Sequence, residues 1–160
     1  MPKEETPQRH ALINRTRTLC QNFSHQADLT TLLSNFTQEH PPPTALEHGL
    51  PQLAPFLGRA FTGHEGLRQY FGMLAELLTM ERMEFEPEED WVVDERAMAV
   101  SLRGKARFRW NETGQAWEET FAYRIGLTEA EEGGEVKVVF YEVWADTGAA
   151  YLARIGQLDS

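Results

Sequence analysis

The chain has 160 residues, a formal net charge of −10 at pH 7 and an apolar fraction of 41%. These values are typical of one globular domain with a substantial core, and no apolar run reaches the roughly 18 residues that cross a bilayer. The charge disfavours nucleic-acid binding, and the single cysteine, Cys20, excludes an internal disulfide.

The N-terminus is polar and lacks the apolar stretch of a signal peptide. We therefore expect a cytoplasmic protein. No internal repeat or linker interrupts the sequence, which predicts that residues 1–160 form one domain. Residues 1–6 are expected to be disordered.

Two helices are predicted next. Pro7 suits the first position of a helix, and apolar residues recur at helical spacing through residues 12–23. Cys20 belongs to this apolar face and is expected to be an unreactive core thiol. Asp28 is typical of the N-cap of a second helix, which has its apolar face within residues 29–36.

A Pro-rich connection and a third helix follow. Three consecutive prolines exclude helix or central strand at residues 41–43. A short strand is predicted at residues 44–49, and residues 50–60 are expected to form a loop. Thr62 and Glu65 have the spacing of a capping box at the start of a helix ending near Leu78. One apolar face of this helix is formed by Leu67, Tyr70, Phe71, Leu74, Leu77 and Leu78.

The second half of the chain predicts strands. One or two strands are expected in residues 82–93, and residues 97–110 alternate between apolar and polar side chains. A four-residue loop at 112–115 predicts a hairpin with a strand at 116–128. This hairpin would place Trp110 opposite Trp117, Phe108 opposite Glu119, and Arg109 opposite Glu118.

The last strand, residues 135–146, is apolar on both faces. Such a strand is covered on both sides, and we expect helices on one side and a second subunit on the other. Thr147 then begins a short final helix. This order of elements predicts an α+β fold with helices packed on one face of a strongly bent sheet.

These features resemble the nuclear transport factor 2-like superfamily and, within it, the SnoaL-like group. The resemblance rests on Phe61-Thr62-Gly63 at the start of the third helix, on the end of that helix near Leu78, on the long strands, and on the closing Glu142 and Trp144-Ala145-Asp146-Thr147. It implies a cone-shaped cystatin-like α+β roll, in which three helices pack on a bent antiparallel sheet beside a short C-terminal helix. It also implies an apolar pocket and a homodimer formed through the sheet. Catalytic members use buried carboxylates with a His or Tyr, and no metal or cofactor.

Two carboxylates are candidates for proton transfer. Glu142 lies between Phe140 and Trp144 on one strand face, and Glu119 lies between Trp117 and Phe121. Burial among aromatic rings would raise the pKa of either group. Glu142 could instead pair with an arginine, and Glu119 could reach water near the hairpin end. The loop before the last strand leaves open which face Glu142 occupies.

His48 and Tyr123 are the candidate proton partners. His48 can titrate near neutral pH and lies on the short strand that, by resemblance, borders the pocket, although a surface or core histidine is the simpler interpretation. Asp146 is more typical of a helix cap than of a catalytic residue. The five histidines lack metal-ligand spacing, so no metal is expected. The basic stripe of Arg103, Lys105, Arg107 and Arg109 is interpreted as a solvated, salt-bridged face.

The many aromatic residues of the chain predict an aromatic-lined pocket. Packing of these side chains in the core is the alternative explanation. The expected lining of the pocket is Phe56, Tyr70, Phe71, Leu74, Trp91, Leu102, Phe108, Trp110, Phe121, Phe140 and Trp144.

Two functions remain open. The first is a cofactor-free isomerase, cyclase or dehydratase for an apolar, polyketide- or terpenoid-like molecule, with Glu142, His48, Tyr123 and Glu119 as catalytic residues. The second is a non-catalytic ligand-binding or dimerisation module of the same fold.

Overall fold

A computed structural model describes residues 6–129 and 134–159. The expected disorder at residues 1–6 concerns a segment of which only Thr6 is described, and Thr6 is the N-cap of the first helix. Most of the acidic loop before the last strand also lies outside the described residues. No helix in the described part of the chain is long and apolar enough to cross a membrane.

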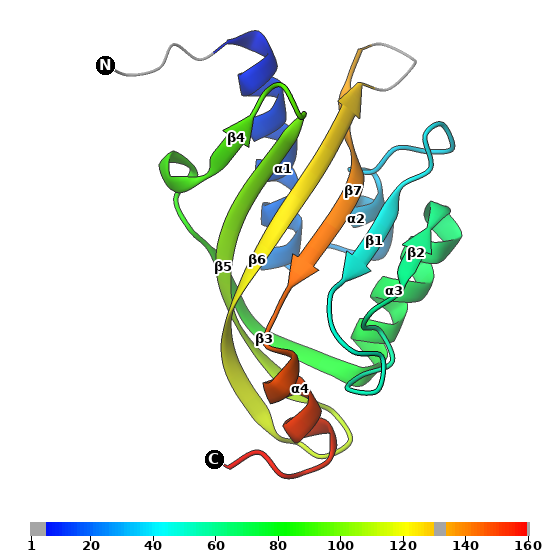
Figure 1. The fold of residues 1–160 in the computed structure, drawn as a ribbon, viewed down its shortest axis with the longest axis vertical. Helices are drawn as coiled ribbons and strands as arrows, with labels where there is room; N and C mark the ends of the chain where they lie inside the picture. Colours follow the sequence, from blue (N-terminus) through cyan, green and yellow to red (C-terminus); the bar gives the residue numbers. More distant parts are fainter. Residues whose placement is uncertain (1–5, 130–133, 160) are drawn as a thin grey trace.

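The described strands form one curved sheet in the order β2-β1-β7-β6-β5-β3, with β4 paired to β5 (Figure 1). All neighbours are antiparallel except β1 and β7, which are parallel. The bounds are β1 Thr44–Glu47, β2 Ala60–Thr62, β3 Leu78–Phe85, β4 Val92–Asp94, β5 Ala99–Trp110, β6 Ala116–Glu129 and β7 Val136–Trp144.

The helices lie against the concave side and the lower end of this sheet (Figure 1). They are α1 Pro7–Ser24, α2 Leu29–Leu33, α3 Gly63–Leu77 and α4 Thr147–Arg154, with a short 3₁₀ helix η1 at Glu88–Asp90. The predicted α+β class, with helices on a bent sheet, is confirmed.

Two differences concern strand positions. The stretch expected to be a loop at 50–60 ends in β2, which pairs with β1. The strand expected within 82–93 begins earlier, directly after α3, and η1 separates it from β4.

Two of the predicted helix caps are present. The Asp28 side chain accepts a hydrogen bond from the Thr31 backbone N at 2.8 Å, and Asp146 accepts one from the Ala149 N at 3.0 Å. The predicted capping box at Thr62 is wrong. Thr62 makes no side-chain cap bond, because it also ends β2 and its hydroxyl lies 3.3 Å from that of Thr44 on β1.

The β5–β6 hairpin has the predicted four-residue loop, but one residue earlier. Trp110 N donates to Gln115 O at 2.8 Å, so the loop is residues 111–114. Phe108 therefore lies opposite Trp117, where Trp110 was expected. The reason is Gly114, whose φ of 75° is left-handed; as the last loop residue it occupies the position that favours glycine.

The pairing of β5 with β6 differs from the predicted one by two residues, which keeps the same faces together because side chains alternate with a period of two. Arg109 lies opposite Ala116, and Glu118 lies opposite Arg107. The basic stripe is salt-bridged as interpreted for three of its four members. Glu81 pairs with Arg107 and Arg109, and Glu86 pairs with Arg103.

A β-bulge in β7 reverses the strand's faces. Gly126 pairs with Phe140 while Leu127 pairs with Val138, so Val139 has no opposite residue. One inserted residue exchanges inner and outer side chains beyond it. Val138 is therefore buried before the bulge, whereas Tyr141 and Val143 are buried after it. Phe140, Glu142 and Trp144 consequently face away from the core.

Two glycines differ in the space around them: Gly104 on β5 is closely packed against β6 and β3, whereas Gly72 on α3 is open. A Cβ at Gly104 on β5 would lie 2.3 Å from the Phe121 ring and 2.9 Å from the Glu84 carbonyl oxygen, whereas a Cβ at Gly72 on α3 meets nothing within 4 Å. We expect Gly104→Ala to destabilise the protein by about 1–3 kcal/mol. Gly72→Ala should stabilise it by about 0.5–1 kcal/mol, because glycine weakens a helix interior. Urea unfolding of both variants measures the difference, and an unchanged midpoint for Gly104→Ala would contradict the packing described.

Candidate active site

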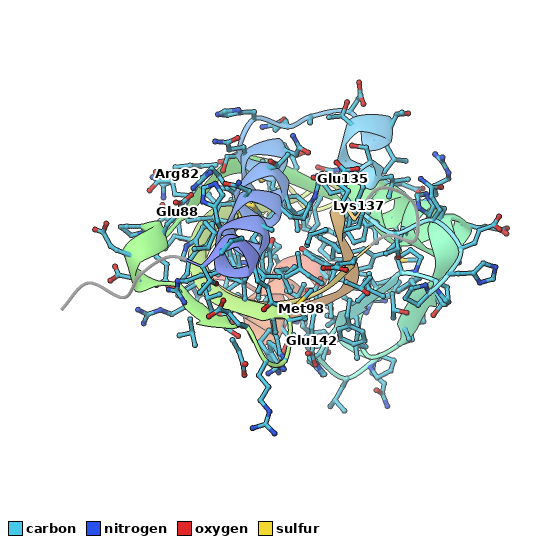
Figure 2. All side chains as sticks on the ribbon, turned by 90° about the horizontal axis from the view of Figure 1, so that it is seen from above. Arg82, Glu88, Met98, Glu135, Lys137 and Glu142 are labelled. Atoms are coloured by element: carbon cyan, nitrogen blue, oxygen red, sulfur yellow. The ribbon has the colours of Figure 1, made fainter. Side chains whose placement is uncertain are left out.

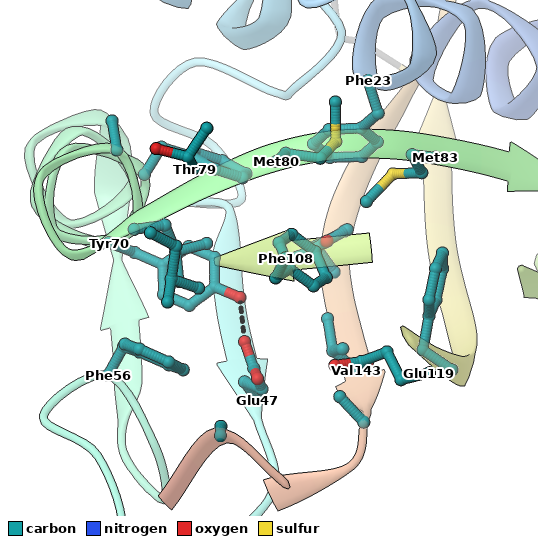
Figure 3. Close-up of a pocket in the computed structure, with 18 of the residues that line it drawn as sticks. Phe23, Glu47, Phe56, Tyr70, Thr79, Met80, Met83, Phe108, Glu119 and Val143 are labelled. Atoms are coloured by element: carbon teal, nitrogen blue, oxygen red, sulfur yellow. Dashed lines mark hydrogen bonds between the residues drawn. The ribbon is translucent and has the colours of Figure 1, made fainter. Parts of the chain in front are cut away.

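A cavity of about 520 Å³ lies between the helices and the concave side of the sheet (Figure 3). Its volume is within the usual range for small-molecule sites. Exposed residues at its mouth include Gln26, Ala75 and Thr79. Aromatic rings make up much of the wall: Phe23, Phe56, Tyr70, Phe71, Phe108, Trp117, Phe121, Tyr123 and Tyr141.

Glu47 is the most buried carboxyl group in this wall. It ends β1 and pairs with Val143 of β7, which directs its side chain inward beside the buried Ala45. Tyr70 Oη on α3 donates a hydrogen bond of 2.6 Å to Glu47 Oε1 (Figure 3). Only 8% of Glu47 is exposed.

Burial raises the pKa of Glu47 from 4.5 to about 7. The hydrogen bond from Tyr70 opposes this shift because it favours the ionised carboxylate, and the negative charge of Glu119 adds to it. A pKa close to neutrality suits Glu47 to general acid–base catalysis at physiological pH.

Glu119 is a second buried carboxyl in the cavity wall. Trp117 Nε1 donates to its Oε1 at 2.7 Å, and Asp146 N donates to its Oε2 at 3.4 Å. Burial raises its pKa to about 6, the two hydrogen bonds lower it, and the Asp146 carboxylate raises it again. Glu119 thus has a fixed orientation and a pKa close to neutrality.

Tyr123 and Tyr141 lie side by side, with ring centroids 5.0 Å apart. Their hydroxyls share a hydrogen bond, and burial holds the pKa of both well above its usual value. Both tyrosines are therefore neutral at physiological pH and supply hydroxyl groups to the apolar wall.

The other two predicted catalytic residues lie outside the cavity. His48 Nε2 is 2.7 Å from Glu142 Oε2, and the His48 ring stacks on Trp144 with centroids 4.6 Å apart. None of the three lines the cavity. Figure 2 shows Glu142 at the edge of the molecule, on the opposite side of the sheet from α1. The bulge at Val139 is the reason, since it sets the outward direction of Glu142 and Trp144.

Some of the expected pocket residues line the cavity and others do not. Those that line the cavity are Phe56, Tyr70, Phe71, Leu74, Phe108 and Phe121. Trp91, Leu102 and Trp110 are buried in the core but do not line it. Trp91 is held by a hydrogen bond from its Nε1 to Glu86 O. Phe140 and Trp144 are on the outer face beyond the bulge.

Glu47 was not among the catalytic residues predicted from the sequence. The available signal was the alternation of β1, in which Ala45 and Glu47 share one face and His48 the other. The candidate site thus combines Glu47 and Tyr70 with the predicted Glu119 and Tyr123. In the described part of the chain, no group of three or more His, Cys, Asp or Glu side chains could hold a metal ion.

Solved structures share this architecture. A nuclear transport factor 2-like protein from Burkholderia xenovorans aligns over 90% of this chain and 95% of its own, with a TM-score of 0.66 and 17% identity. PrhC from Penicillium brasilianum aligns over 94% and 93%, with a TM-score of 0.67 and 17% identity. A candidate polyketide cyclase from Xanthomonas campestris aligns over 91% and 98%, with a TM-score of 0.65 and 10% identity.

The chain therefore has the nuclear transport factor 2-like fold. At these identities the likeness is one of fold. No protein-family model matches the sequence, and no curated protein is significantly similar to it.

Proposed function

We propose that the protein is a cofactor-free acid–base enzyme of the SnoaL-like type. It would catalyse isomerisation, cyclisation or dehydration of an apolar, polyketide- or terpenoid-like molecule. The observation that carries the proposal is Glu47, a carboxyl group with a pKa near 7, held by Tyr70 in the wall of an aromatic cavity. The candidate polyketide cyclase of the same fold supports the reaction class.

The roles follow from the local chemistry. Ionised Glu47 removes a proton from a carbon next to a substrate carbonyl and becomes the neutral acid. The electron pair of the broken C–H bond forms the C=C bond of an enolate, and the π pair of the carbonyl moves to its oxygen. Neutral Glu47 then returns the proton to another carbon in isomerisation, or to the departing hydroxyl oxygen in dehydration. Glu119 lies in the same cavity wall and serves as the second proton-transfer group. The apolar wall raises the pKa values of both carboxyl groups toward neutral pH.

The pH dependence of kcat/KM tests this proposal. Since Glu47 acts first as a base, kcat/KM is expected to rise with pH and to level off above a pKa of about 7. Tyr70→Phe removes the hydrogen bond that favours the carboxylate, so the rise should move to higher pH. Substrates for the assay come from mass spectrometry of molecules that co-purify with the protein. A kcat/KM that is constant from about pH 5 to 9 would exclude Glu47 as the base.

The alternative function, a binding or dimerisation module, is supported by the outer face. Trp144 is 44% exposed there, beside half-buried Phe140. We propose a homodimer through this face, which is compatible with either function. The solution mass should then be twice the 18.3 kDa of one chain, and Trp144→Glu should shift the protein toward monomer because a buried unpaired charge is costly. A wild-type mass of one chain would rule out this dimer.

A further inference from the structure

The charged groups of the cavity have one sign. Among the described residues that line it, the ionisable acids are Glu47, Glu119 and Asp146, and no Lys, Arg or His is present. Arginines gather on the opposite face of the sheet, where Glu81 pairs with both Arg107 and Arg109. An anionic ligand would therefore enter a cavity without a counter-charge, in a chain whose net charge is −10.

Three of the four aromatic O–H and N–H donors among the described residues of the wall are already engaged. Tyr70 donates to Glu47, and Trp117 donates to Glu119. In the Tyr123–Tyr141 pair one hydroxyl donates to the other, so one tyrosine O–H is left to donate. An anion needs donors, whereas the carboxylates of Glu47 and Glu119 each keep acceptor capacity for an incoming donor.

The aromatic wall of the cavity also favours a cationic ligand over an anionic one. Each ring has a negative face, which attracts a cation and repels an anion. Tyr70, Tyr141 and Tyr123 lie on three neighbouring elements beside Glu47, with centroids 6.2 Å apart for Tyr70 and Tyr141. Aromatic rings close to carboxylates are suited to an ammonium group on an apolar skeleton.

We infer that the molecule bound in this cavity is a lipophilic cation, an apolar ring system carrying a protonated amine that pairs with Glu47 or Glu119. The inference rests on one part of the proposed function, namely that the substrate binds in this cavity. It narrows the proposed substrate class from apolar, polyketide- or terpenoid-like molecules to those that carry a protonated amine.

Amine binding is coupled to the ionisation of Glu47. The groups that face this carboxyl are Tyr70 of α3, Tyr141 of β7, and Tyr123 and Glu119 of β6. None of them carries a positive charge, so the ligand ammonium supplies the first counter-charge. The pair forms only with the ionised carboxyl, and binding at neutral pH releases protons to the buffer.

The experiment compares three naphthalene probes of one shape: 2-naphthylmethylamine, 2-naphthylmethanol and 2-naphthoate. Isothermal titration calorimetry at about pH 8 gives their affinities for the wild-type protein, with both carboxyls largely ionised. The amine is expected to bind about tenfold more tightly than the alcohol, and the carboxylate at least about tenfold more weakly than the alcohol. At pH 7, amine titrations in two buffers of different ionisation enthalpy should report proton release.

Isosteric variants locate the charge. Glu47→Gln and Glu119→Gln together are expected to abolish the preference for the amine while keeping the alcohol affinity. Glu142→Gln, on the outer face, is the matched control and should leave all three affinities unchanged. Equal binding of amine and alcohol to the wild type, or tightest binding of the carboxylate, overturns the inference whether or not the variants fold.

These outcomes are separate from those of the proposed function, because they measure binding and not turnover. If the protein showed no preference for the amine but kept the expected pH–rate profile, the amine inference would be wrong and the proposed acid–base function would stand. Amine selectivity in a protein without turnover would support a binding module of the same charge preference.

Discussion

Replacing Glu47 with glutamine is expected to lower kcat by about 10²–10⁴-fold, the usual contribution of a general acid–base group. Glutamine has nearly the same shape and can still accept the hydrogen bond from Tyr70, so the cavity should stay intact. What it lacks is a carboxyl group that can accept and return a proton. Steady-state kinetics on the co-purifying substrate measures the effect.

Two variants make this prediction specific. Glu142→Gln removes the carboxylate that sequence analysis singled out, and we expect its kcat to stay within about threefold of wild type, because Glu142 faces away from the cavity. Glu119→Gln is expected to reduce kcat, since it removes the second proton-transfer group. If Glu47→Gln retained wild-type turnover while Glu142→Gln lost it, the outer His48–Glu142 pair would be the catalytic site.

The same substitution is expected to change how stability depends on pH. The pKa of Glu47 is about 7 in the folded protein and near its ordinary 4.5 when unfolded. Between these values the folded state holds more protons than the unfolded state, so the free energy of unfolding falls as pH rises through this window. The fully developed cost of ionising buried Glu47 is about 3 kcal/mol above pH 7.

Urea unfolding of wild type and Glu47→Gln at several pH values measures this difference. The advantage of Glu47→Gln should grow by about 3 kcal/mol between about pH 4.5 and 8, since glutamine does not ionise. Glu119→Gln provides an internal comparison. The free energy of unfolding of Glu119→Gln relative to wild type should rise mostly by about pH 6, because the pKa of Glu119 is lower than that of Glu47. The gain should reach about 2 kcal/mol. A constant difference between Glu47→Gln and wild type would mean that Glu47 is not buried as described.

The predictable parts of this protein are those that follow from local patterns. The inward set of β6, which includes Trp117, Phe121 and Tyr123, is buried as its alternation predicts. Asp28 and Asp146 cap helices because a short acidic side chain can reach the free backbone N–H groups. Thr62 has the same local spacing as a cap, but pairing with Thr44 from another strand overrides it.

The site was only half predictable. Glu119 and Tyr123 lie on a long regular strand, so alternation places them correctly on the inner face. Glu47 ends a four-residue strand between a proline run and a loop, where too few residues exist to establish a period. Its role depends on Tyr70, 23 residues away on α3, and such a contact has no local sequence signal.

The sequence by itself determined the α+β class, the helix on residues 63–77, the aromatic inner face of β6 and the excess of acidic over basic residues. Tertiary structure alone decided which carboxylates share the cavity. A single unpaired residue, Val139, turns Glu142 and Trp144 outward, while the parallel pairing of β1 with β7 turns Glu47 inward. The physical reason is the two-residue period of a strand, since one inserted residue exchanges its faces.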